Sequence, residues 1–142
     1  SFNSPYGACQ SCDGIGTELY FDVDLIIPDK SKSLKGGAIA PWSEGMSRFQ
    51  LQTLEGLAKH FEFDLNAPFC QIPKNIQEII LNGSQDLEIE MTYSDGVRKQ
   101  VVKKAFEGIV PHLHKRLNDA DSIWIKDELA KYQNERKCLS CD

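Results

Sequence analysis

The sequence predicts an α+β fold, with several helices and a small antiparallel sheet or hairpin on a zinc base of four cysteines. Three segments alternate apolar and polar residues, the period of a half-buried strand, and four others repeat apolar residues at the helical period. Two Cys-x-x-Cys pairs lie at opposite ends of the 142-residue chain. Four thiolates in two pairs make a closed tetrahedral zinc site, so we expect the chain ends to meet at a metal.

The first half of the chain predicts one strand and one helix. Residues 19–25 alternate apolar and acidic side chains and predict a strand that Pro28 ends. Residues 29–46 are polar and rich in glycine, which favours a structured loop. Ser47 and Gln50 form a capping-box pattern at the start of a helix. Its expected apolar face consists of Phe49, Leu54, Leu57, Ala58 and Phe61.

The second half predicts a helix, a hairpin and two more helices. Pro73 suits the first position of a helix, and Gly83 suits the residue just past its end. Alternation over 87–93 and again over 97–101, around Asp95-Gly96, predicts a β-hairpin. Its polar face and far end are expected to carry Arg98, Lys99, Lys103 and Lys104. The helical period then returns from Ile109 and again over 122–132.

Composition indicates a soluble globular domain with its own core, because 41% of the residues are hydrophobic and 26% are charged. No apolar run is long enough to span a membrane. The net charge of −5 argues against nucleic-acid binding by the whole surface. However, residues 95–116 hold six cations and two anions, a net charge of +4, which leaves −9 for the remainder. The six cations are Arg98, Lys99, Lys103, Lys104, Lys115 and Arg116.

The four paired cysteines, Cys9, Cys12, Cys138 and Cys141, are the expected ligands of one structural Zn²⁺. A thioredoxin-like redox motif would need a strand before the pair and a helix after it, whereas glycines surround the first pair. It also remains open that each pair binds a different metal with ligands from outside this chain. A site with four protein ligands leaves no position for water, so a zinc enzyme is disfavoured.

The fifth cysteine, Cys70, is expected to be a small buried apolar residue. An odd cysteine count favours a reducing cytoplasm over an exported disulfide protein. The chain begins with Ser1 rather than Met, and we interpret it as a piece of a longer protein. Residues 1–17 and 134–142 would form a zinc-binding neck, and residues 18–133 would form an inserted domain.

Four segments of the chain resemble those of one known family. The longest is residues 1–16, SFNSPYGACQSCDGIG, which resembles the segment that leads into the insertion domain of the bacterial UvrA proteins of the excinuclease ABC system. Residues 37–42, GAIAPW, and residues 106–111, FEGIVP, look like its next blocks. Cys138-x-x-Cys141 resembles the return to the family's signature domain. The resemblance covers essentially the whole chain in the right order.

The resemblance implies the insertion domain of an ABC-type ATPase that finds damaged DNA in nucleotide excision repair, part of the SOS response. Such domains are thought to help clamp double-stranded DNA and to separate damaged from undamaged duplex. The parent protein would form a homodimer and work with UvrB. The chain has neither a phosphate-binding loop nor an ABC signature, so it is expected to be non-catalytic and to bind no ATP. Relatives often carry a stronger basic run where this chain has His112, His114, Lys115 and Arg116.

Two interpretations compete with DNA contact. The cations of residues 98–116 are also compatible with an ordinary solvated surface. Alternatively, residues 9–16 resemble one zinc repeat of the DnaJ cochaperones, which would make the chain a protein-interaction module. That family uses four such repeats close together, and the second cysteine pair here lacks the glycine spacing. Phosphate contact by Lys and Arg would give sequence-independent affinity, which suits a protein that meets varied lesions.

Overall fold

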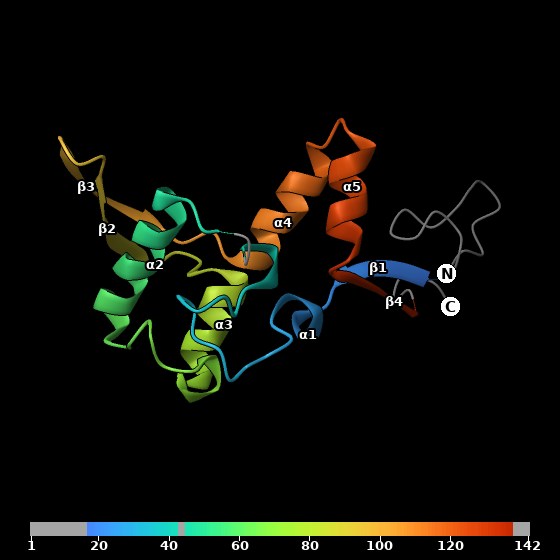
Figure 1. Cartoon of the computed structure of the whole chain (residues 1–142), viewed down its shortest axis with the longest axis horizontal. Helices are drawn as coiled ribbons and strands as arrows, with labels where there is room; N and C mark the ends of the chain where they lie inside the picture. The colour runs from blue at the N-terminus through green and yellow to red at the C-terminus, as the bar shows by residue number, and fades with distance from the viewer. Residues whose placement is uncertain (1–16, 43–44, 138–142) are drawn as a thin grey trace.

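A computed structural model describes residues 17–42 and 45–137, and Figure 1 shows their arrangement. In chain order the elements are β1 (Thr17–Phe21), α1 (Val23–Ile26), the 3-10 turn η1 (Ala40–Trp42), α2 (Arg48–Phe61), the 3-10 turn η2 (Phe69–Gln71), α3 (Lys74–Asn82), β2 (Glu88–Ser94), β3 (Lys99–Ala105), α4 (Ile109–Asn118), α5 (Ile123–Ala130) and β4 (Gln133–Lys137). The strands of this part form two separate antiparallel pairs, β1 with β4 and β2 with β3. The predicted α+β class is therefore confirmed.

The β1–β4 pair joins the beginning and the end of the described chain. Thr17 lies opposite Lys137 and Phe21 lies opposite Gln133. The predicted strand over 19–25 is too long, because β1 ends at Phe21. Asp22 then caps the short helix α1, where its Oδ1 accepts a hydrogen bond from the N–H of Asp24 at 2.9 Å. The cap turns the chain away from the sheet.

Helix α2 begins at the predicted capping box. The Ser47 hydroxyl accepts from the Gln50 N–H at 3.1 Å, and the Gln50 side chain accepts from the Ser47 N–H at 3.0 Å. Leu54 and Leu57 on the apolar face are fully buried, as expected. Gly56 lets α2 approach β2 closely, because a Cβ there would lie 3.1 Å from the Glu90 carbonyl oxygen.

Helix α3 ends at Asn82, and Gly83 follows its end as predicted, whereas Pro73 is the N-cap rather than the first helical residue. Cys70 in η2 is exposed, so the expectation of a buried thiol is wrong. The reason is local: its neighbours Phe69 and Ile72 are the residues of this segment that enter the core.

The predicted hairpin is formed by β2 and β3, but its faces differ in part from the prediction. Ile89 and Met91 are fully buried on the side that meets α2. Met91 lies opposite Val102, and directly paired residues share a face, so Val102 also points inward. The adjacent Val101 is consequently 56% exposed on the opposite face.

Figure 1 shows the hairpin at one end of the molecule and the β1–β4 pair at the other, with α3 and α4 between them. One apolar core runs through this body and includes Phe69, Ile80, Ile109 and Leu113. Helix α4 packs on α3 and α5. Among the described residues, no helix is long and apolar enough to cross a membrane.

Candidate nucleic-acid interface

The hairpin carries four of the six predicted cations, but on two faces. Lys99 and Lys103 are exposed on the face that points away from Met91, together with Val101. Glu90 lies directly across from Lys103, whereas the partner of Lys99 is the uncharged Ser94. Glu88, opposite Ala105, is exposed on the same face, so the two lysines and the two glutamates balance there. The positive charge of this face lies toward the turn, where Lys99 is located.

The turn of the hairpin is held by a carboxylate. Oδ1 of Asp95 accepts hydrogen bonds from the N–H groups of Arg98 at 2.7 Å and Val97 at 2.9 Å. These bonds, led by the one from Arg98, lower the pKa of Asp95 below its ordinary value, and the charge of Arg48 adds to the effect. Gly96 has a φ of 94°, which favours glycine. The turn thus places Arg98 at the exposed tip.

Lys104 lies on the other face of the hairpin, so the prediction that all four cations share the polar face and far end is wrong for this residue. It pairs with Ile89, and its Nζ lies 4.8 Å from the ring centroids of both Phe49 and Tyr93. The two rings are stacked, with centroids 4.8 Å apart and planes 7° from parallel. The Tyr93 hydroxyl also contacts the Thr53 hydroxyl at 2.8 Å. A cation over aromatic faces is attracted by the ring quadrupole.

Phe49 was expected on the buried face of α2, but it is 56% exposed. It lies in the first turn of the helix, beyond the part that covers Met91. One face of its ring meets Tyr93, and the ring also borders a cavity of about 250 Å³, hereafter the aromatic pocket. A second, separate surface hollow borders the Phe49–Tyr93 stack. Both rings line it together with two cations, Arg48 and Arg98.

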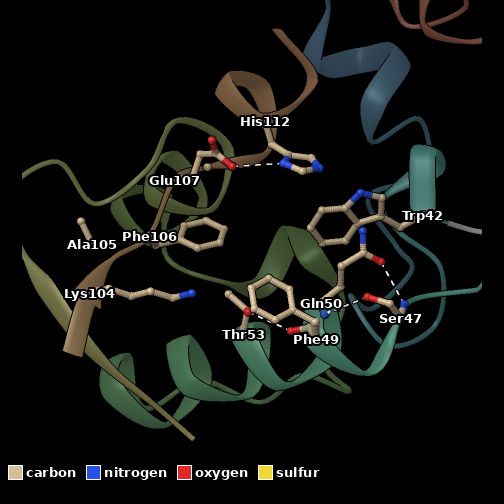
Figure 2. A pocket seen from close by; sticks show the side chains of 11 residues that line it. Trp42, Ser47, Phe49, Gln50, Thr53, Lys104, Ala105, Phe106, Glu107 and His112 are labelled. Carbon is tan, nitrogen blue, oxygen red and sulfur yellow. Dashed lines mark hydrogen bonds and ion pairs between the residues drawn. The ribbon is translucent and has the colours of Figure 1, made fainter. Parts of the chain in front are cut away.

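The aromatic pocket lies between η1, the start of α2 and the segment that links β3 to α4. Figure 2 shows the side chains of Trp42, Phe49 and Phe106 around one space, with the imidazole of His112 nearby. Trp42 and His112 meet edge to face with centroids 6.4 Å apart. His112 is fixed from the other side, because its Nδ1 lies 3.1 Å from Oε1 of Glu107. Lys104 also lines the pocket.

The remaining predicted cations, Lys115 and Arg116, lie in the last turn of α4 and are exposed. A cation at this end of a helix is favoured by the helix dipole, so their position has a structural explanation. Because α4 packs on α3 and α5, the structure divides the six cations into a hairpin group and an α4 pair. The rings of His114, also on α4, and Phe21 are perpendicular, with centroids 4.8 Å apart.

The four predicted zinc ligands, Cys9, Cys12, Cys138 and Cys141, lie outside the described residues. Within residues 17–42 and 45–137, no three His, Cys, Asp or Glu side chains are grouped to hold a metal. The β1–β4 register nevertheless bears on the prediction. Because Thr17 pairs with Lys137, the two cysteine segments join the described chain at adjacent positions.

Sequence reasoning missed the aromatic part of this surface. Tyr93 belongs to the alternation that predicts the hairpin, and this pattern gave no sign that its ring stacks on Phe49. Arg48 and Phe49 directly follow the N-cap Ser47, and that position could have suggested exposure. The first turn of a helix often extends beyond the element on which the helix packs.

Comparisons with known proteins identify the family of the chain. A family model described as the UvrA DNA-binding domain matches residues 22–131. The chain is 45% identical over 141 residues to UvrABC system protein A of Rickettsia typhi, covering 99% of this chain and 15% of that protein. It is 44% identical over 142 residues to the same protein of Bradyrhizobium diazoefficiens, covering 100% and 14%. The chain thus spans about 15% of the length of these relatives.

The fold is also similar to a solved structure, that of UvrA2 from Deinococcus radiodurans. The TM-score is 0.72, and the match covers 99% of this chain and 18% of that one. At 20% sequence identity this likeness concerns the fold.

Proposed function

The chain belongs to the family of UvrA DNA-binding domains, and from this premise we propose that it is a non-catalytic, DNA-contacting insertion domain of a UvrA protein. In nucleotide excision repair it would help to clamp DNA and to discriminate damaged from undamaged duplex. The parent protein would be a cytoplasmic homodimer that works with UvrB. ATP would bind elsewhere in that protein, because this chain has no phosphate-binding loop.

The observation that carries the proposal is the cationic end of the hairpin. Arg98, Lys99 and Lys103 are exposed on a chain whose net charge is otherwise strongly negative. Phosphates neutralised by Lys and Arg release counterions, so such a contact is independent of sequence and sensitive to salt. Repair requires this property, since lesions differ in their base edges.

The α4 pair, Lys115 and Arg116, is included as a second, weaker contact. Both side chains are exposed, but α4 packs mainly on α3 and α5, so they would reach a different stretch of the DNA backbone. Their contribution to DNA affinity is expected to be smaller than that of the hairpin group.

We also propose that Cys9, Cys12, Cys138 and Cys141 hold one structural Zn²⁺ in a neck formed by residues 1–17 and 134–142. Cysteine thiolates are preferred zinc ligands, and four of them close the coordination sphere. The pairing of Thr17 with Lys137 supports this arrangement, because the two cysteine segments are attached to the described chain at paired residues.

The test is a titration of the chain with a labelled duplex of about 30 base pairs at about 50 and 200 mM salt. Replacing Lys99 and Lys103 by alanine should remove up to two phosphate contacts and flatten the slope of log K against log salt by about 1.8. Raising the salt fourfold weakens binding by both proteins. The factor by which the affinity falls should be about 12 times smaller for the variant than for the unmodified chain.

The matched control replaces Lys35 and Lys126, two exposed lysines outside the hairpin, by alanine. It removes the same charge and should leave the salt slope unchanged. An equal change in both double variants would mean that net charge, and not the hairpin, determines binding. Absence of binding at the lower salt concentration would reject DNA contact by this chain.

A further inference from the structure

The aromatic pocket has the size and walls of a site for one flat ring. Its volume of about 250 Å³ is below the range of about 300–1,000 Å³ that is usual for drug-sized ligands. Trp42, Phe49 and Phe106 supply aromatic surface from three separate segments. Phe49 is 56% exposed, so one aromatic wall is open to solvent.

The charge beside the pocket suits a nucleotide. Lys104 lines it from β3 while its ammonium lies over the rings of Phe49 and Tyr93. An ammonium has three donors, so it can contact the rings and still bind a phosphate. Glu107 is the acidic residue of the lining, and its carboxylate is engaged by His112 at 3.1 Å.

From these features we propose that the aromatic pocket binds a single unstacked base of DNA, which stacks on Phe49 while Lys104 contacts the adjoining phosphate. The inference rests on the proposed DNA contact and extends it. The pocket would lie beside DNA held at the turn of the hairpin, because Arg48 and Arg98 line a neighbouring hollow that shares Phe49 with the pocket. It adds a local readout to an otherwise sequence-independent contact.

Such a pocket would respond to weakened base pairs. Stacking of a base on an aromatic side chain raises affinity roughly 5- to 150-fold. Flipping a normally paired base out of the helix has a cost of similar size, and the cost is lowest for a mismatched, damaged or unpaired base. The gain therefore exceeds the cost only where pairing has already been lost.

The test compares three duplexes of equal length with the 142-residue chain: fully paired, with one bulged adenine, and with one bulged abasic site. The two bulges distort the backbone alike, but only one offers a base. We expect the adenine bulge to bind at least about 5-fold more tightly than the abasic bulge. Phe49→Leu should remove this difference without changing affinity for the paired duplex, and Phe49→Tyr, which keeps the ring, should retain it.

Trp124→Leu is the control for exposed aromatic surface in general, because Trp124 is 83% exposed and does not line the pocket. It should leave the difference between the two bulges intact. Equal affinity for both bulges would overturn the inference, as would a Phe49→Leu variant that weakens all three duplexes alike. Either result leaves the proposed DNA contact standing, whereas absence of binding to every duplex would reject both.

Discussion

Gly83 and Gly108 touch where α3 ends and α4 begins, and we predict that Gly83→Ala destabilises the domain severely. A Cβ on Gly83 would lie 2.5 Å from the carbonyl oxygen of Glu107 and 2.8 Å from that of Phe106. Both are backbone atoms, so relief requires the chain to move. The backbone angles of Gly83, φ 100° and ψ 166°, also lie in a region that is essentially restricted to glycine.

The expected loss combines three physical contributions. The unfavourable backbone angles cost about 1–3 kcal/mol. Overpacking against fixed backbone typically costs a further 1–3 kcal/mol or so. A shift would also strain two hydrogen bonds beside the contact, from Ser84 N–H to Phe106 O at 2.9 Å and from Phe106 N–H to Ser84 Oγ at 2.7 Å. We therefore expect a loss of about 3–6 kcal/mol, a large part of the roughly 5–15 kcal/mol that holds a domain together.

Urea denaturation, with the free energy of unfolding extrapolated to water, measures this loss. Gly37→Ala is the matched control, because Gly37 has a similar φ of 94° but no atom within 4 Å of the added Cβ. It should cost only the backbone part, about 1–3 kcal/mol. If the two variants are equally destabilised, the close approach contributes nothing, and the reasoning is refuted.

Three further results are expected. The pKa of Asp95 is lowered in the fold, so the ionised carboxylate stabilises the domain. This stabilisation is complete above the ordinary pKa of 3.8 and is lost as the pH falls through the lower pKa of the folded state. Asp95→Asn should remove this part of the pH dependence of thermal unfolding. Ser47→Ala removes half of the capping box and should lower the free energy of unfolding in urea by about 1 kcal/mol. A zinc chelator should lower the melting temperature of the domain. A colorimetric zinc assay should find less than one ion per chain in Cys9→Ser, which lacks a proposed ligand. The same assay should find one ion per chain in Cys70→Ser, because Cys70 is not a proposed ligand.

Local signals determined how well each element could be predicted from the sequence. The start of α2, the end of α3 and the hairpin follow from Ser47, Gly83 and Gly96, whose effects act over one to four residues. The first strand was overestimated because alternation continued through Val23. The partner strand β4 begins at Gln133, opposite Phe21, and this pairing of distant segments cannot be read from the local pattern.

The functional surface was predictable by charge but not by shape. The cluster of cations was visible as a local excess of Lys and Arg. Adjacent residues of a strand point to opposite faces, so the separation of Lys103 from Lys104 could have been read from the sequence. The face that is covered could not, because it follows from the packing of Met91 and Val102 in the fold. The aromatic pocket was invisible for a similar reason: Trp42, Phe49 and Phe106 come from three segments that only the fold brings together. Helical periodicity assigned Phe49 to the core and gave no sign that the packing ends before it.

The distribution of charge has a consequence for how such a domain would hold DNA. Four hairpin cations at four phosphates would give a salt slope of about −3.6, so the affinity would fall about 150-fold between 50 and 200 mM salt. The remainder of the chain carries a net charge of −9 and repels phosphates, and this repulsion is screened beyond about 8 Å at physiological salt.

Contact is therefore favoured at the hairpin end, farthest from the β1–β4 pair by which the domain would join its parent (Figure 1). A contact of this kind is weak and reversible on its own. It would gain strength where the remainder of the proposed parent protein, or a second copy, holds the same duplex and so raises the effective concentration of the hairpin. Under these conditions, one stacked base in the aromatic pocket would be enough to change the lifetime of the complex at a weakened pair.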